Sequence, residues 1–512
     1  MRRPALVFAL LLGLSLPFAG KPVHLDDANF LRLAAGARAD PWRPHAISIN
    51  WQGTTERAFD VLSNPPGIGW WLAPVADAPI WGMHLWMLLW LPLAVWGAWT
   101  LGARFAGRGA EAAVLLVGGP LGLLAAQSLM PDLPLLACTL AGLGGLTRER
   151  GPALARRWPW ALLVGAAALF RYSGAALVPL VALWALLHRD RRAALTLTMG
   201  AAAPLTLLLL HDLHAYGQPH LVAMLGFQSA EGGGGRAAAR KLVAAVAMLG
   251  GAGVLPLLGR LRSRAVGALV GVALGAVGAA LSHQSGVPLA ATLLAGAAGG
   301  ATLGACAGAL DRDRLWLLAW LVGGLVFLLQ LRFMAGRYWL PFLAPAVLLP
   351  LAATPRRWLR VAVVITPLLG LALAASDQAL ARAQARLAAT VLDAADGEAG
   401  LIAGHWGFQH HLEAAGWAPL DDDAPVPPGT LLAVSAASWP QTPARGACLT
   451  PLARSTDPAH LGRPRVHTAT GGANVHAFVV SGRPPVETYA PWSFGTDPHD
   501  TVTLWRGCDR SR

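Results

Sequence analysis

Apolar runs long enough to cross a lipid bilayer recur along the chain from its first residues to about residue 376. A transmembrane helix needs about 20 mostly apolar residues, and these runs of roughly 17–25 residues meet that length. Only 13% of the residues are charged, whereas a soluble protein of this length carries about 25%. A soluble enzyme with buried helices is therefore a poor interpretation, and the sequence predicts an all-α polytopic membrane protein.

Hydropathy in windows of about 19 residues predicts about thirteen transmembrane helices. The segment 158–187 is ambiguous, because it reads either as one long helix or as a hairpin broken near the sequence FRYSG. The predicted spans cover approximately 4–20, 81–102, 111–128, 131–147, 158–170, 172–187, 193–211, 242–259, 265–281, 286–309, 315–331, 338–354 and 359–376.

The first of these spans lies in the sequence MRRPALVFALLLGLSLPFAG, which has the charged start and short apolar core of a signal peptide. Cleavage after PFAG is one interpretation. We favour an uncleaved first helix, because a polytopic protein inserts through its first span in any case.

Basic residues are concentrated in the short linkers 103–109, 148–157, 188–192, 260–264, 311–314 and 354–360. The positive-inside rule places such linkers in the cytoplasm, and placing all of them there requires the hairpin interpretation of 158–187. The N-terminus is then cytoplasmic and the C-terminal region extracytoplasmic (periplasmic), on the outer side of a bacterial inner membrane. The net charge of +13 thus reflects membrane orientation and does not indicate a nucleic-acid partner.

The chain changes character after about residue 376. Residues 377–512 are rich in Asp, His, Pro and Gly, and short apolar runs at 400–405, 430–436, 475–480 and 501–507 read as strands separated by turns. The run 410–416 reads as a short helix ended by Gly. We therefore predict a transmembrane domain, 1–376, with a first outer loop at 21–80, and a small α/β or α+β extracytoplasmic domain, 377–512.

The four cysteines fall into two groups. Cys138 and Cys306 lie inside apolar runs and read as small core residues. Cys448 and Cys508 lie in the C-terminal domain, where an oxidising compartment would allow a disulfide, although spacing alone does not establish one.

Ionisable residues gather at the outer ends of the predicted helices. An ionisable residue at membrane depth is costly and usually faces a cavity or a partner. Carboxylates can act as general bases or bind a metal, and the planar fork of Arg matches a phosphate, so this set indicates chemistry on a phosphate-bearing lipid. Its members are Asp26, Asp27, Asp132, Arg171, His211, Asp212, His214, Arg332 and Arg337.

Each of these residues also has a plainer interpretation. Asp26 or Asp27 suits the N-cap of the helix predicted by DDANFLRLAAGARA, and one acid can cap while the other reacts. Asp132 suits a helix first turn, where the helix dipole favours an acid. Arg337, beside Tyr338 and Trp339, suits an anchor in an interfacial aromatic belt.

Two histidines are weak candidates for metal ligands. His211 and His214 are three residues apart, which places them on one helical face, but the sequence identifies no clear third ligand. The residues leave open whether a divalent metal serves as a cofactor.

Four motifs occur in an order that resembles a known family. They are HLDDANFLRLA, NPPGIGWWLAP, SLMPDLPLLACTLAG and GRYWLPFLAPAVLL. Their order, spacing and sidedness over residues 1–376 resemble the GT-C fold membrane glycosyltransferases, in the bacterial branch near the protein O-mannosyltransferases and the lipid A aminoarabinose transferases.

The resemblance implies transfer of a sugar from a polyprenyl-phosphate carrier to an acceptor on the outer face of the membrane, with inversion. It implies that Asp26 is the catalytic base and Asp27 the second member of the acidic pair. It also implies that Arg337, in the motif that continues with Tyr338, lies near the donor phosphate, and that Asp132 belongs to the family's Pro-Asp motif. Arg171 and Arg332 join these as candidate substrate-binding residues.

The sequence departs from the aminoarabinose transferases at Ser63 and Asn64. In that family an acidic and a basic residue precede the paired prolines of the first loop. The departure puts metal dependence in doubt and argues against lipid A as the acceptor.

Other function classes stay open. A polysaccharide polymerase or ligase shares lipid-linked substrates but normally carries its large outer loop late in the chain. A transporter or flippase often shows inverted repeats, and none is visible here. A non-catalytic scaffold would leave Asp26 and Arg337 without a role. The sugar is not readable from the sequence, and the acceptor is a lipid, a glycan or a protein.

Overall fold

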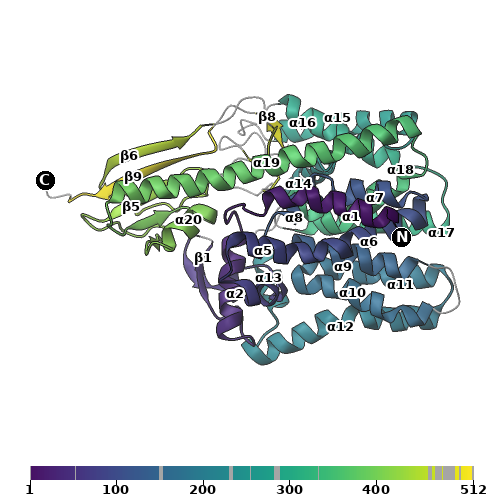
Figure 1. Ribbon diagram of the computed structural model, residues 1–512, viewed down its shortest axis with the longest axis horizontal. Coiled ribbons are helices and arrows are strands. Elements are labelled where there is room, and N and C mark those ends of the chain that lie inside the picture. The colour runs from purple at the N-terminus through teal and green to yellow at the C-terminus, as the bar shows by residue number, and fades with distance from the viewer. Residues whose placement is uncertain are drawn as a thin grey trace.

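The computed structural model has a helical bundle with a small β-sheet domain at one end (Figure 1). This arrangement agrees with the predicted fold class, a mostly helical chain that ends in a small mixed domain. The structure describes residues 2–509 except 52, 149–153, 230–234, 254, 282–288, 332–333, 459–463, 468–474, 477–490 and 495–497.

The first helix packs along α6 (Leu91–Ala106) and α7 (Gly109–Val117) of the bundle, and the first outer loop forms short elements at the sheet-domain end. The helices are α1 (Arg2–Ser15), the 3₁₀ helix η1 (Leu16–Phe18), α2 (Asp27–Ala39), α3 (Ala58–Val61), α4 (Gly67–Leu72) and η2 (Ala73–Val75), and the strands are β1 (Ser48–Asn50) and β2 (Thr55–Arg57). The two strands pair in antiparallel register, with Ile49 opposite Glu56. This loop is therefore a structured layer over the bundle.

The bundle itself is built from helices that are often interrupted at Pro and Gly. In chain order they are α5 (Ile80–Met87), η3 (Leu88–Trp90), α6 (Leu91–Ala106), α7 (Gly109–Val117), α8 (Pro120–Ala126), α9 (Asp132–Thr147), η4 (Leu154–Arg157), α10 (Trp158–Phe170), η5 (Tyr172–Leu177), α11 (Val178–Leu187), α12 (Arg191–Tyr216), α13 (His220–Ser229), α14 (Gly235–Gly250), η6 (Leu255–Leu257), α15 (Leu261–Leu281), α16 (Leu289–Ala305), α17 (Arg312–Gln330), η7 (Gly336–Phe342), α18 (Ala344–Leu351) and α19 (Arg356–Ala395).

Within the described residues, four helices are long and apolar enough to cross a membrane: Ile80–Ala106, Arg191–Tyr216, Arg312–Gln330 and Arg356–Ala395. The pair α7 and α8 makes a fifth if it is counted as one span bent by 65°. The bend falls at Gly118 and Gly119, directly before Pro120, whose ring cannot continue the preceding helix. The chain is thus a multi-pass membrane protein, while the predicted number of thirteen spans is not confirmed.

The ambiguous segment 158–187 folds as a hairpin. Arg171 has extended backbone angles, φ −155° and ψ 133°, and separates α10 from η5. Helix α11 leads through a short turn into α12. Helix α12 lies alongside α10 and runs in the same direction as α10, so α11 runs in the opposite direction between them in the chain. Gly200 of α12 lies beside Trp158, and Pro204 lies beside Gly165. The hairpin is the interpretation that the positive-inside rule required.

Helices α15 and α16 approach closely through glycines spaced four residues apart. A Cβ atom added at Gly267 would lie 2.1 Å from the carbonyl oxygen of Gly300, and one at Gly271 would lie 2.0 Å from that of Gly296. Small residues at this spacing let the backbones of membrane helices pack against each other. The series is Gly267, Gly271 and Gly275 on one helix, with Gly296, Gly300 and Gly304 on the other.

Helix α19 joins the bundle to the sheet domain (Figure 1). Its 40 residues correspond to about 60 Å, roughly twice the thickness of a bilayer hydrocarbon core. The helix therefore continues without a break past residue 376, where the predicted last span ends. Its C-terminal half carries Leu387 and Val391 into the core of the sheet domain.

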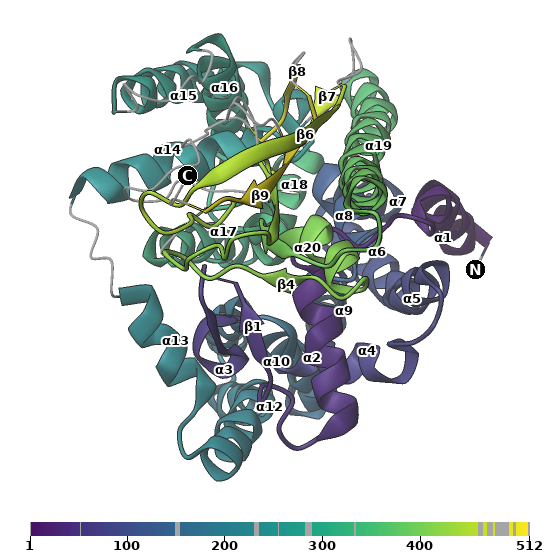
Figure 2. The same cartoon turned by 90° about the vertical axis from the view of Figure 1, so that its left-hand side faces the viewer.

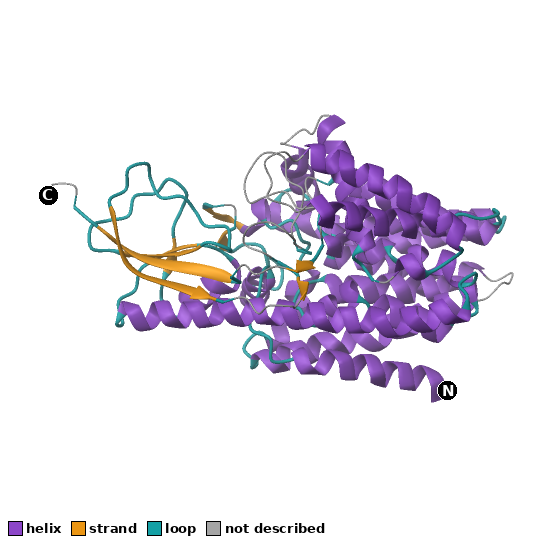
Figure 3. Ribbon diagram, turned by 90° about the horizontal axis from the view of Figure 1, so that it is seen from above, coloured by secondary structure: helices purple, strands orange, loops and turns teal. Residues whose placement is uncertain are grey.

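The sheet domain contains a five-stranded sheet with strand order β4-β3-β5-β9-β6. Strands β3 (Leu401–Ala403), β4 (Ala418–Pro419) and β5 (Leu431–Ser435) are parallel, and β9 (Asp500–Gly507) pairs antiparallel with β5 and with β6 (Leu449–Asp457). Helix α20 (Trp406–Glu413) follows β3, and a separate pair is formed by β7 (Pro464–Arg465) and β8 (Ser493–Phe494). Figure 3 shows the sheet at one end of the molecule, away from the N-terminus.

The predicted strands at 400–405, 430–436 and 501–507 correspond to β3, β5 and β9. The predicted strand at 475–480 lies mostly outside the described residues, and Val475 and His476 form a bend. Strand β6 was not predicted, because its side chains are largely exposed and carry no apolar alternation. Cys448 and Cys508 form a disulfide between the ends of β6 and β9, while Cys138 and Cys306 are free and buried.

The sheet domain rests on the first outer loop (Figure 2). Asn50 of β1 donates to Asp421 at 2.8 Å and accepts from Gln441 at 3.0 Å. An ion pair joins Arg32 of α2 to Glu413 of α20. The loop and the C-terminal domain thus form one polar interface above the helical bundle.

Candidate active site

Asp26 and Arg337 form an ion pair between the start of α2 and η7. Nη2 of Arg337 lies 2.6 Å from Oδ2 of Asp26, and the two side chains are 13% and 16% exposed. Asp26 occupies the N-cap position of α2, yet its side chain makes no capping hydrogen bond. The plainer role as a helix cap therefore does not hold for this carboxylate, which instead faces the arginine.

Asp27 points the other way and is fully buried. Its Oδ1 accepts a hydrogen bond from the backbone N–H of Leu129 at 2.9 Å, and its Oδ2 accepts one from the N–H of His24 at 3.3 Å. Burial raises the pKa of this carboxyl to about 7. The two adjacent acids therefore have different partners. Asp27 joins the first loop to the loop before α9 through the N–H of Leu129, and Asp26 pairs with Arg337.

A second ion pair lies beside the first. Asp132, at the first turn of α9, lies 3.1 Å from Nη2 of Arg171, at the turn of the α10–α11 hairpin. Tyr338 lies close to both arginines, with the Arg171 guanidinium 5.1 Å and the Arg337 guanidinium 5.8 Å from the ring centre. Five of the predicted residues, which come from four separate segments, therefore form one cluster.

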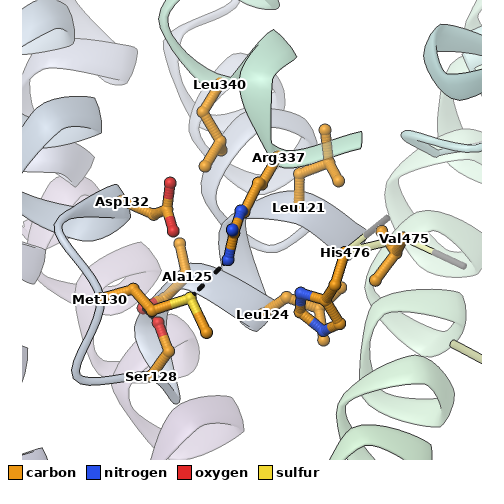
Figure 4. Close-up of a pocket in the computed structure, with 10 residues that line it drawn as sticks. All are labelled: Leu121, Leu124, Ala125, Ser128, Met130, Asp132, Arg337, Leu340, Val475 and His476. Atoms are coloured by element: carbon orange, nitrogen blue, oxygen red, sulfur yellow. Dashed lines mark hydrogen bonds between the residues drawn. The ribbon is translucent and has the colours of Figure 1, made fainter. Parts of the chain in front are cut away.

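A pocket opens beside this cluster (Figure 4). Arg337 and Asp132 line it together with His476, and apolar residues of α8 and η7 close its sides. In Figure 4 the Arg337 side chain reaches into the pocket between Asp132 and His476, and its Nη1 lies 2.8 Å from the sulfur of Met130. The pocket thus combines a cationic group with an apolar wall, and its volume of about 10 Å³ is close to that of a single water molecule.

The remaining predicted site residues lie elsewhere. His211 pairs with Asp212 at 3.0 Å, and the rings of His211 and His214 contact Trp42. Among the residues that the structure describes, these two histidines do not converge with a third His, Cys, Asp or Glu. Arg332 lies outside the described residues.

A buried cluster around Asp377 of α19 was not predicted from the sequence. Oδ2 of Asp377 accepts from Lys21 at 2.6 Å and from Gln127 at 3.2 Å. Nε2 of His24 and Nε2 of His476 lie 3.0 and 2.8 Å from Oδ1. Burial lowers the pKa of His24 to about 4, so its imidazole is neutral at physiological pH.

Most of this cluster has a sequence signal, because three of its residues lie near outer helix ends. Lys21 and His24 directly precede the acidic pair, and Asp377 follows the last predicted span. All three satisfy the criterion that selected Asp26 and Asp132. His476 has no such signal, because it lies in the predicted strand 475–480 of the C-terminal domain and not at a helix end.

Comparisons with known proteins give one distant structural likeness. No family model and no curated protein matches the chain. The crystal structure of ArnT from Cupriavidus metallidurans in the apo state aligns with 80% of this chain and 84% of that chain, at 16% identity and a TM-score of 0.40. This likeness is too distant to assign an activity to the chain.

Proposed function

We propose that this protein is a membrane glycosyltransferase that moves a sugar from a polyprenyl-phosphate donor to an acceptor on the outer face of the inner membrane. The observation that carries the proposal is the junction of Asp26 and Arg337 beside a pocket that is cationic and apolar. A lipid-linked sugar phosphate needs an arginine for its phosphate, an apolar wall for its lipid and a carboxylate for the incoming acceptor.

Arg337 and Arg171 are the donor-binding groups in this proposal. A phosphate accepts two parallel hydrogen bonds from the planar guanidinium fork, and it competes with Asp26 for the same Nη2 atom. Asp132 holds Arg171 through an ion pair, and the Tyr338 ring contacts both guanidinium groups. The phosphate leaves as an anion, which the arginines stabilise as charge develops on it.

Asp26 is the base. When the donor phosphate binds Arg337, it replaces Asp26 as the partner of the guanidinium. The Asp26 carboxylate then accepts the proton of the acceptor hydroxyl or amine. Direct attack of that group on the anomeric carbon breaks the bond to phosphate and inverts the configuration. Asp27, fully buried and held by two backbone N–H groups, is a positioning residue for the helix that presents Asp26.

The C-terminal domain supports the proposed sidedness of the site. Val475 and His476 of that domain line the same pocket as Arg337. The Cys448–Cys508 disulfide supports an oxidising compartment for it, because disulfides persist in the periplasm and are rare in the cytoplasm. Both observations support a pocket that faces the outer side of the membrane, where the proposed donor is used.

A transfer assay tests the proposal. Purified protein would be mixed with a panel of polyprenyl-phosphate sugars and a membrane extract as acceptor, with and without chelator. Wild type should transfer sugar from at least one donor and Asp26→Asn should not. Asp60→Asn is the matched control, because this acid of the same loop forms only an exposed pair with Arg57.

Transfer that survives in Asp26→Asn would remove Asp26 from the role of base. A wild-type protein that consumes no donor but moves the carrier across a vesicle membrane would show a flippase instead of a transferase.

A further inference from the structure

Three groups that can bind a metal converge from three distant segments of the chain. They are Nε2 of His24, before α2, a carboxylate oxygen of Asp377, in α19, and Nε2 of His476, in the sheet domain. The three atoms all lie within 4.8 Å of one another. Among the described residues, this is the one group of three such ligands.

The distances suit a small divalent ion. Two ligands bound at about 2.0–2.1 Å in a tetrahedral zinc site lie about 3.3 Å apart. The two histidine nitrogens lie 3.0 and 2.8 Å from Oδ1 of Asp377, so these two distances would lengthen by a few tenths of an ångström around the ion, while the two nitrogens lie within 4.8 Å of each other. Two imidazoles and one carboxylate are a ligand set that zinc enzymes use, with a fourth position left for a water or a substrate oxygen.

The surroundings hold the carboxylate in place. Lys21 and Gln127 donate to Oδ2, which fixes the rotation of the carboxylate and keeps Oδ1 turned toward the histidines. Such outer contacts orient the ligands in metal sites.

The bend that carries His476 is anchored on both sides. The N–H of Val475 donates to the carbonyl of Val466 at 2.9 Å, and its carbonyl accepts from the N–H of Gly336 at 3.0 Å. Gly336 directly precedes Arg337, and His476 lines the same pocket as Arg337 (Figure 4). The histidine therefore lies at the edge of the pocket, and its side chain is 11% exposed.

We propose that His24, Asp377 and His476 form a site for a divalent transition metal, with zinc the best match, at the edge of the pocket. The ion joins the first loop, the last transmembrane helix and the sheet domain through one centre. The site is independent of the proposed sugar transfer, because it is defined by metal binding and is measured without a donor.

Cobalt binding tests the site. Full-length protein in detergent would be stripped with a chelator, dialysed and titrated with Co²⁺, whose visible absorption reports four-coordinate binding, and then with competing Zn²⁺. We expect one equivalent of metal per chain in wild type. His24→Ala and His476→Ala should each weaken binding by at least about tenfold, since even outer-shell changes cost 10- to 100-fold.

The control is the double variant His211→Ala/His214→Ala, which removes the histidine pair that the sequence indicated and should leave cobalt binding unchanged. The two single variants change different segments, so a folding defect in one, detected by circular dichroism and gel filtration, leaves the other to decide. A wild-type chain that binds neither metal would overturn the proposal. Binding that persists in both single variants, or that is lost only in the control, would overturn it as well.

Discussion

Nη2 of Arg337 lies 2.6 Å from Oδ2 of Asp26, across 311 residues of sequence. In the proposed function, Arg337 binds the donor phosphate and Asp26 is the base. The ion pair therefore joins the phosphate-binding group directly to the base. While the pair is intact, the arginine occupies Oδ2 of this carboxylate. Donor binding and base release are therefore coupled in the proposed reaction.

The first prediction concerns this pair. Arg337→Ala should lower kcat/KM for the donor by about 10²–10³, the loss typical of a removed group that stabilises developing charge. KM for the donor should rise while KM for the acceptor stays within about twofold. Steady-state kinetics with each substrate varied in turn would measure both, with Arg57→Ala as the control on an exposed arginine. An unchanged donor KM in Arg337→Ala would separate Arg337 from the phosphate.

The second prediction concerns the contact between the first loop and the sheet domain. Gly53 has φ +96°, and a Cβ there would lie 1.9 Å from Oδ2 of Asp422. Gly53→Ala should therefore combine backbone strain of about 1 kcal/mol with a clash that displaces Asp422 from Thr442. Hydrogen exchange should become faster in β1 and β2.

Gly416→Ala is the control for this experiment. Gly416 has φ +86° and nothing within 4 Å of its added Cβ, so the variant has the strain without the clash. Equal exchange of β1 and β2 in the two variants would mean that the clash has no effect on docking.

The third prediction concerns the disulfide. Cys448 and Cys508 close a loop of 60 residues, and the loop-entropy model gives such a crosslink about 4 kcal/mol of stability. Cys448→Ser/Cys508→Ser should lower the unfolding temperature of the sheet domain, as reductant should in wild type. Reductant should have no further effect on the double variant, because Cys138 and Cys306 are already free thiols. A reductant-induced shift in that variant would contradict the assignment.

The fourth prediction concerns Asp500, buried in the sheet domain. Its carboxylate accepts hydrogen bonds from Ser435, from the N–H of Ala437 and from its neighbour Thr501. Burial raises the pKa of this carboxyl to about 6. A raised acid pKa stabilises the fold below the unfolded pKa, near 4, and that stability is lost as the pH rises through about 6. The loss amounts to about 3 kcal/mol.

Hydrogen exchange of β5 and β9 at pH 5 and pH 7.5, corrected for the intrinsic pH dependence of exchange, would measure this loss. Asp500→Asn cannot ionise and should show a smaller difference between the two pH values than wild type. An equal difference in both proteins would assign the effect to another group.

The helical membrane part of the fold could be predicted because hydropathy and charge act locally. A window of sequence reports its own preference for lipid, and basic linkers report their side of the membrane. The basic linkers predicted the hairpin at Arg171, and short apolar runs predicted the strands β3, β5 and β9. The number of spans could not be predicted, because Pro and Gly divide apolar runs into helices too short to be assigned by length, as at Gly118 and Gly119.

The sequence alone determined which residues were available for chemistry: acids and arginines at outer helix ends, where an ion is costly unless it has a partner. Only the tertiary structure decided the partners. It turned Asp26 toward Arg337 and Asp27 into the interior, and it brought His476 to Asp377, although neither pairing has a local signal. Contacts between distant segments depend on how whole helices pack, and the preference of one segment for lipid or water contains no information about that packing.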